Sequence, residues 1–206
     1  MDTPELPQIY LSTPTSLDID VYPDTLARVL DGAEIACLRL SLASTDEDHV
    51  ARAADAVREV AHARDIAIVI SDHVLMAQRL GLDGVHLTDA AKSVRAARKE
   101  LGADAIVGSF CGTSRHDGLN AGEAGVDYVS FGPVGSSALG DGTTAATDLF
   151  QWWSDVVEVP IVAEGGLTPE LIRTLTPCTD FFGIGDEIWS AEDPLAALNT
   201  LIAAMS

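Results

Sequence analysis

The sequence of 206 residues predicts one α/β domain, residues 1–206, folded as a (β/α)8 or TIM barrel. Eight short apolar runs are spaced along the chain, and a segment with helical spacing of apolar residues follows each of them. The runs are continuously apolar, which is typical of parallel strands that are buried on both faces. Eight such units favour a closed barrel, whose active site would lie at the carboxyl ends of the strands.

The expected strands are the apolar runs themselves, and the run at 66–70 is the clearest of them. In chain order they cover residues 9–11, 35–41, 66–70, 84–88, 105–110, 128–133, 160–162 and 180–185. The run at 35–41 carries an arginine, Arg39, whose charge we expect to point into the mouth of the barrel. An open doubly wound sheet is the alternative, but no G-x-G-x-x-G follows the first run, which argues against its dinucleotide-binding form.

The expected helices are read from apolar spacing and from the residues that begin and end helices. The longest covers 46–64, while Asp89 is placed to cap a helix that runs through Leu101 and ends at Gly102. The others fall near 23–30, 75–80, 115–125, 149–156, 169–175 and 194–205. The longest irregular stretch, 134–147, is rich in Gly, Ser, Thr and Ala, which is typical of lids and binding loops.

Composition limits the classes of function. The formal net charge is −20, from 32 acidic and 12 basic residues, so a nucleic-acid binder is disfavoured. No apolar run reaches the roughly 18 residues of a membrane span, and the acidic N-terminus shows no basic region of a signal peptide. Cys37, Cys111 and Cys178 are dispersed, which indicates reduced thiols and a cytoplasmic protein.

The turn at 162–170, V-A-E-G-G-L-T-P-E, is the most informative stretch. A Thr followed by a Pro predicts a helix that begins at Pro169 with Thr168 as its N-cap. Gly165 and Gly166 allow backbone N–H groups to approach a ligand closely, and a helix N-terminus favours an anion. In barrels of this class, phosphate sites commonly use the loops after strands seven and eight, where this turn and Gly185 lie.

Five motifs follow one another along the predicted barrel: I-S-D at 70–72, D-G-V-H-L at 83–87, A-G-V-D-Y-V at 124–129, F-G-P-V at 131–134 and the turn at 162–170. In this order the sequence resembles the thiamine phosphate synthase family, which includes the thiazole tautomerases. The resemblance implies an enzyme of thiamine biosynthesis that couples an aminopyrimidine diphosphate to a thiazole phosphate and releases diphosphate. It further implies Mg²⁺, a small-molecule ligand and a homodimer.

The resemblance also implies which residues form the site. Arg39 and Asp72 would be catalytic, and Asp72 and Asp89 would be the metal carboxylates. The substrate and phosphate site would comprise Ser137, Gly165, Gly166 and Gly185, together with Glu164 and Asp186, which stand where the family carries an apolar residue and a serine.

Several positions depart from the family pattern. The loop at 137–140 lacks the diphosphate-binding lysine, and the second metal aspartate falls on Ala91, for which Asp89 would substitute only in part. Asp186 and Glu187 stand where backbone and serine donors would hold a phosphate. A carboxylate and a phosphate about 4 Å apart repel each other by roughly 4 kcal/mol at an effective dielectric constant near 20.

Structural roles for the same residues remain open. Arg39 would form a buried ion pair with Asp72 or Glu164, and Asp72 would cap the helix that follows it. His86 is expected to be a hydrogen-bonded core histidine, and Asp186 and Glu187 would favour the start of a short helix through its dipole. Two hypotheses of function follow: a thiamine-phosphate-synthase-type transferase with a degenerate diphosphate site, or a barrel without that chemistry. The second would be an inactive ligand-binding or regulatory protein, or an enzyme acting on a less anionic molecule.

Overall fold

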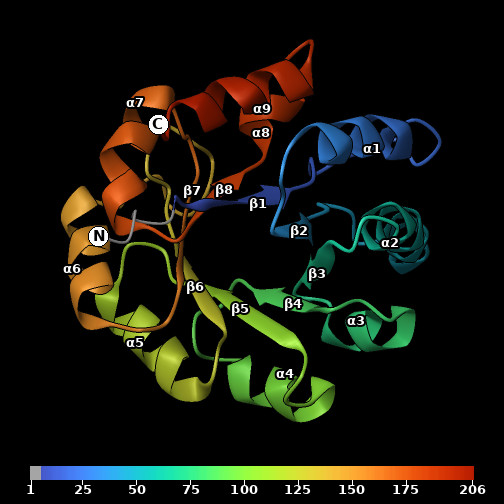
Figure 1. Ribbon diagram of the computed structural model, residues 1–206. Coiled ribbons are helices and arrows are strands. Elements are labelled where there is room, and N and C mark those ends of the chain that lie inside the picture. The colour runs from blue at the N-terminus through green and yellow to red at the C-terminus, as the bar shows by residue number, and fades with distance from the viewer. Residues whose placement is uncertain (1–5) are drawn as a thin grey trace.

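The computed structural model describes residues 6–206 as a closed barrel of eight parallel strands, in sequence order around the barrel (Figure 1). The strands are β1 (Gln8–Ser12), β2 (Cys37–Leu40), β3 (Ala67–Ser71), β4 (Gly84–Leu87), β5 (Ile106–Phe110), β6 (Tyr128–Phe131), β7 (Ile161–Glu164) and β8 (Phe181–Ile184). The barrel closes because β8 pairs with β1 in parallel, with Gln8 opposite Phe181. The predicted fold class is therefore confirmed.

Helices surround the barrel and cover its outer face (Figure 1). They are α1 (Tyr22–Gly32), α2 (Glu47–His62), α3 (Val74–Leu80), α4 (Val94–Leu101), α5 (Arg115–Ala124), α6 (Thr147–Val156), α7 (Pro169–Leu175), α8 (Asp186–Trp189) and α9 (Pro194–Ala203). A short 3₁₀ helix, Thr176–Cys178, follows α7. None of the helices in residues 6–206 is long and apolar enough to cross a membrane.

The main core lies between the barrel and its helices, and a smaller cluster fills the barrel interior. The outer layer includes fully buried Phe131, Phe150 and Trp153, whose rings meet edge to face. The interior cluster contains Tyr10, Val69, Tyr128 and Val162. The interior is therefore a packed core with polar atoms among the rings, as expected for a barrel of this class.

The start of α4 differs from the sequence prediction. Asp89 does not cap a helix, because residues 89–93 form turns and Ala90 has a φ of +56°, a left-handed conformation that an α-helix excludes. The Asp89 carboxylate instead accepts a hydrogen bond from the Ser93 hydroxyl at 2.6 Å. The helix begins only at Val94.

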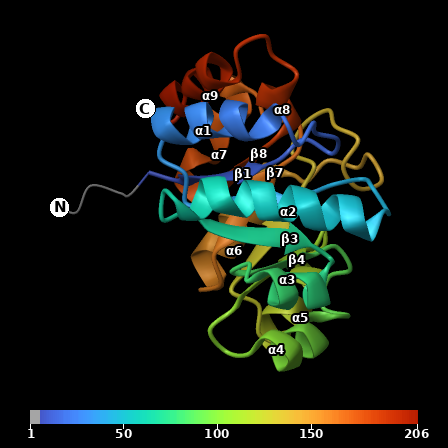
Figure 2. The same cartoon turned by 90° about the vertical axis from the view of Figure 1, so that its right-hand side faces the viewer.

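At the carboxyl ends of the strands, the loop after β6 packs directly against the turn after β7. The N–H of Gly135 donates to the carbonyl of Gly165 at 2.9 Å. A side chain at Gly166 would lie 2.6 Å from the backbone of Gly135, and one at Gly135 would lie 2.1 Å from the carbonyl of Gly166. Only glycine allows this approach, which brings the 136–146 segment over the mouth. In Figure 2 this loop and the one after β1 project from the same end.

Candidate ligand-binding site

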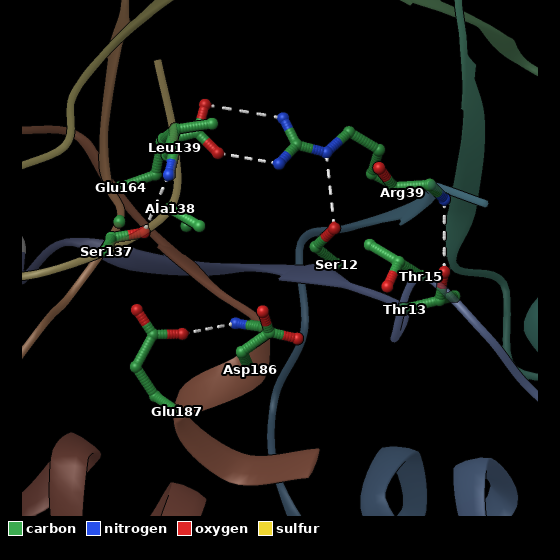
Figure 3. A pocket seen from close by; sticks show the side chains of 14 residues that line it. Ser12, Thr13, Thr15, Arg39, Ser137, Ala138, Leu139, Glu164, Asp186 and Glu187 are labelled. Carbon is green, nitrogen blue, oxygen red and sulfur yellow. Dashed lines mark hydrogen bonds and ion pairs between the residues drawn. The ribbon is translucent and has the colours of Figure 1, made fainter. Parts of the chain in front are cut away.

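A cavity of about 240 Å³ opens at the carboxyl ends of β1, β2, β7 and β8. Most of its polar side chains come from these strands and the loops that follow them (Figure 3). The cavity is lined by Ser12, Thr13, Thr15, Arg39, Ser41, Ser137, Ala138, Leu139, Glu164, Gly165, Gly183, Gly185, Asp186 and Glu187. Its size falls just below the roughly 300–1,000 Å³ of most ligand pockets, which favours a small ligand.

A buried ion pair forms the floor of the cavity. The guanidinium of Arg39 donates to both carboxylate oxygens of Glu164, at 2.6 and 3.4 Å, and its Nε donates to the Ser12 hydroxyl at 3.3 Å (Figure 3). Only 8% of Arg39 and 4% of Glu164 is exposed. Burial acts to raise the pKa of Glu164, but the charges and hydrogen bonds of its neighbours, Arg39 foremost, lower it to about 2. The pair is therefore fully charged at neutral pH.

His86 links this ion pair to the barrel interior. Arg39 Nη1 donates to His86 Nε2 at 2.8 Å, so the imidazole proton resides on Nδ1, which donates to the Tyr128 hydroxyl at 2.8 Å. The hydroxyls of Tyr128 and Tyr10 lie 2.6 Å apart. Burial and then the Arg39 charge lower the pKa of His86 to about 3. His86 is thus a neutral core histidine, as the sequence predicted, and its Nε2 lone pair is not free to act as a base.

The carboxylate of Glu187 binds the N–H groups of the turn after β7, where the sequence predicted an anion site. Its Oε1 accepts hydrogen bonds from the backbone N–H groups of Gly166 at 3.0 Å and Leu167 at 3.1 Å. Its Oε2 accepts from the N–H of Gly185 at 2.8 Å, a contact drawn in Figure 3. The carboxylate therefore joins the turn after β7 to the turn after β8. Gly165 and Gly166 have φ of +85° and +74°, a left-handed backbone conformation that glycine adopts without steric cost.

The cavity is acidic overall. Arg39 is the one basic residue among the described residues that line it, and Glu164, Asp186 and Glu187 are acidic. Glu164 neutralises the arginine, which leaves two carboxylates at the β8 edge. The Asp186 side chain is exposed on the first turn of α8.

The two predicted metal carboxylates lie outside this cavity. Asp72 follows β3 at the same end of the barrel, but it is exposed, and its two oxygens accept from the backbone N–H and the hydroxyl of Thr88 at 2.9 and 2.7 Å. It neither pairs with Arg39 nor caps α3, whose N-cap is His73. Asp72 has a φ of +60° and bridges the ends of β3 and β4.

These residues fit a magnesium ion poorly. Mg²⁺ requires a near-octahedral shell of oxygen ligands, and of the two carboxylates that the family resemblance implies the chain keeps only Asp72, because the second falls on Ala91. Residues 6–206 contain no group of three or more His, Cys, Asp or Glu side chains that could hold a metal. These residues therefore assign no chemical step to a metal ion.

The cavity thus contains most, but not all, of the residues singled out from the sequence. Arg39, Ser137, Glu164, Gly165, Gly185 and Asp186 line it, whereas Asp72, Asp89 and Gly166 do not. Gly166 nevertheless contributes through its N–H to Glu187. Sequence reasoning missed the hydroxyl side, where Thr13 accepts from the N–H of Ser41 at 3.1 Å. The cluster S-T-P-T-S after β1 was the available signal, because it follows a barrel strand directly.

Fold and cavity together define a TIM-barrel protein with a small-ligand pocket at the strand ends. The family model for thiamine monophosphate synthase matches residues 9–179, and the chain belongs to this family. It is 38% identical over 187 residues to the thiamine-phosphate synthase of Rhodospirillum centenum, covering 89% of each chain, and 36% identical to that of Erythrobacter litoralis, covering 93% of each.

Solved structures show the same fold. A thiamine phosphate pyrophosphorylase from Pyrococcus furiosus superposes with a TM-score of 0.83 at 19% identity, covering 96% of this chain and 95% of that one. The 3-hexulose-6-phosphate synthase from Salmonella typhimurium superposes with a TM-score of 0.73 at 14% identity, covering 96% and 98%. At these identities the likeness concerns the barrel alone.

Proposed function

We propose that the protein is a thiamine-phosphate-synthase-type transferase with a weakened diphosphate site. The reaction would couple an aminopyrimidine diphosphate to a thiazole phosphate, as the family resemblance implies. The observation that carries the proposal is Arg39: the residue kept from the family motif on β2 lines the cavity at the strand ends. Family membership over residues 9–179 supports the same reaction class.

The weakness of the diphosphate site follows from charge. Departure of diphosphate places negative charge on the leaving oxygens, which preorganised cations or N–H donors must stabilise. The Nη atoms of Arg39 donate to Glu164 and His86, so its charge is largely neutralised within the protein. The loop at 137–140 supplies no lysine. Loss of one such donor typically lowers kcat by about 10²–10³-fold, so turnover with the usual substrates should be slow.

A second candidate is a ligand-binding barrel without transferase activity. The observation that favours it is Glu187, which occupies three N–H donors that would otherwise be available to a phosphate. Under this alternative the fold and the pocket persist, and the pocket holds a ligand that it does not transform.

The deciding experiment follows formation of thiamine phosphate by purified protein with both substrates and Mg²⁺. The Rhodospirillum centenum relative serves as the reference. The matched control is the double variant Arg39→Met/Glu164→Leu, which removes both buried charges together and so leaves neither unpaired. We expect slow turnover that this double variant abolishes. Turnover as fast as the reference contradicts the weakened site, and no turnover with retained thiazole binding supports the ligand-binding alternative.

The proposal includes a cytoplasmic location and a homodimer. Cys37, Cys111 and Cys178 are free thiols, which supports a reducing compartment. The homodimer rests on family resemblance alone, and sedimentation of the purified protein tests it.

A further inference from the structure

The carboxylate of Glu187 makes the contacts of a bound anion. Three backbone N–H groups from two separate turns converge on it, at 2.8 to 3.1 Å. Convergent N–H groups of this kind, in turns rich in glycine, form the usual cradle for a phosphate or carboxylate. Here the anion belongs to the protein itself.

A role as a simple helix cap does not account for this geometry. A cap of α8 would need N–H groups of α8 alone, yet two of the three donors, Gly166 and Leu167, lie on the turn after β7. The side chain also lines the cavity, so a ligand at this edge would meet the carboxylate. The carboxylate therefore takes the position that a ligand phosphate would need.

A phosphate ester would be repelled electrostatically at this edge. It carries a charge of about −1.5 to −2 at neutral pH, and it would have to displace Glu187 while lying beside Asp186. The single basic residue among the described lining residues, Arg39, is already paired at 2.6 Å with Glu164. A ligand hydroxyl, in contrast, would find acceptors in the two carboxylates and the hydroxyls of Thr13 and Thr15.

We propose that Glu187 is a built-in replacement for a ligand phosphate and that the pocket selects a small neutral or cationic ring compound bearing a hydroxyl group. The inference rests on the proposed function for one point, the thiazole class of the ring. It adds that thiazole phosphate, the substrate of the proposed reaction, binds more weakly than the corresponding alcohol, which gives a reason for the slow turnover expected. It assigns Glu187 as the residue that determines specificity at the β7–β8 edge. Removal of its side chain should open the cradle and convert the pocket to one that binds phosphate.

The first experiment uses inorganic phosphate as the probe and requires no knowledge of the ring. Melting temperatures are measured in phosphate and in chloride buffers of equal ionic strength. Wild type should show no phosphate-specific rise, and Glu187→Ala should gain one because three N–H donors become free. Asp186→Asn is the matched control: it removes a charge at the adjacent position but frees no N–H group, so it should gain no such rise.

Glu187→Gln is the second variant, in case the alanine variant does not fold. It keeps the side-chain size and an acceptor oxygen but loses the charge, so phosphate should displace it more easily than the native carboxylate and produce a smaller rise. A wild type that responds to phosphate as strongly as these variants overturns the inference. Variants that respond no more than Asp186→Asn overturn it as well.

The second experiment separates this inference from the proposed function. Calorimetry compares hydroxyethylthiazole with its phosphate ester. Wild type should bind the alcohol about 10- to 100-fold more tightly than the ester, and Glu187→Ala should reverse the preference, since charge-assisted hydrogen bonds are worth that factor. If Glu187→Ala gains the phosphate response but neither protein binds either thiazole, the thiazole assignment fails and the role of Glu187 stands. If wild type prefers the ester, the role of Glu187 fails while the thiazole assignment stands.

Discussion

The carboxylates on the two halves of the barrel mouth lie in different environments. On the half formed by β2, β7 and β8, Glu164 and Glu187 are drawn inward by a guanidinium and by three backbone N–H groups. On the half formed by β3 and β4, Asp72 and Asp89 are exposed: Asp72 accepts from Thr88, which follows β4, and Asp89 accepts from Ser93 of its own loop. The difference lies in burial, because Glu164 is buried and Glu187 half-buried, whereas the other two side chains are exposed.

This contrast shows why residue type at a strand end does not by itself define a site. All four acids follow or end a barrel strand, where catalytic residues of such barrels gather. Glu164 and Glu187 line the cavity, whereas Asp72 joins the ends of β3 and β4 and Asp89 holds a turn within its own loop. Substitutions on the two halves should therefore differ widely in their effect on the free energy of unfolding.

The largest effect is expected for Glu164→Ala. Removal of the carboxylate leaves the Arg39 charge buried without a partner, so we expect a loss of about 3–5 kcal/mol in the free energy of unfolding. Urea denaturation measures this loss. The double variant Arg39→Met/Glu164→Leu should recover most of it, because no buried charge remains unpaired. Equal destabilisation in the single and double variants would show that the cavity floor does not depend on charge pairing.

Acid should weaken the buried network of Arg39, Glu164 and His86 in two stages. His86 has a pKa lowered from 6.5 to about 3, and Glu164 has one lowered from 4.5 to about 2. In both cases the unfolded chain binds protons first, so stability falls as pH drops, from about 6.5 for His86 and from about 4.5 for Glu164. The Glu164 stage is worth about 3 kcal/mol.

Urea denaturation across a pH series tests this order. His86→Gln should flatten the stability profile between pH 6.5 and 4.5, the interval set by the two ordinary pKa values. Arg39→Met/Glu164→Leu should flatten it at lower pH. If His86→Gln leaves the upper interval unchanged, the histidine is not the group that takes up the proton.

A smaller effect is expected on the other half, for Asp72. Its oxygens serve the N–H and hydroxyl of Thr88, and its φ is +60°. Asp72→Ala should cost about 1–2 kcal/mol, because it removes both acceptors and places alanine in a left-handed conformation. Asp72→Asn should cost less, since asparagine tolerates that conformation. The melting temperature should respond equally to Mg²⁺ in wild type and both variants, and a rise confined to wild type would identify Asp72 as a metal ligand.

The smallest effect is expected for Asp89→Ala. The side chain is exposed and accepts one hydrogen bond, from Ser93. We expect a loss of at most about 0.5 kcal/mol, within the usual range for surface substitutions. A loss as large as that of Asp72→Ala would mean that the turn before α4 depends on this contact.

The barrel could be predicted because its signals are local. Each strand is a short apolar run, and α2 and α7 begin at residues of the expected type, Asp46 and Thr168, whose side chains accept from backbone N–H groups in the first turn. The start of α4 could not be predicted in this way. Asp89 has the residue type of an N-cap, but the left-handed conformation of Ala90 delays the helix to Val94.

The site could be predicted only in part from the sequence, because its contacts join segments that are distant along the chain. A pair between Arg39 and Glu164 was one of two possibilities, and closure of the barrel selects it by bringing β2 and β7 to face each other across the interior. The acid that reaches the glycine turn could not be chosen from sequence. Asp186 lies nearest to Gly185, but the longer Glu187 reaches back to Gly166, which precedes it by 21 positions.

The tie made by Glu187 has a consequence for the protein without any ligand. A tethered carboxylate acts at a fixed effective concentration, whereas a free anion stabilises a protein only in proportion to the logarithm of its concentration. The turns after β7 and β8 are thus clamped together by a group that dilution or dialysis does not remove. The shape of this edge of the mouth therefore forms during folding and does not depend on ligand binding.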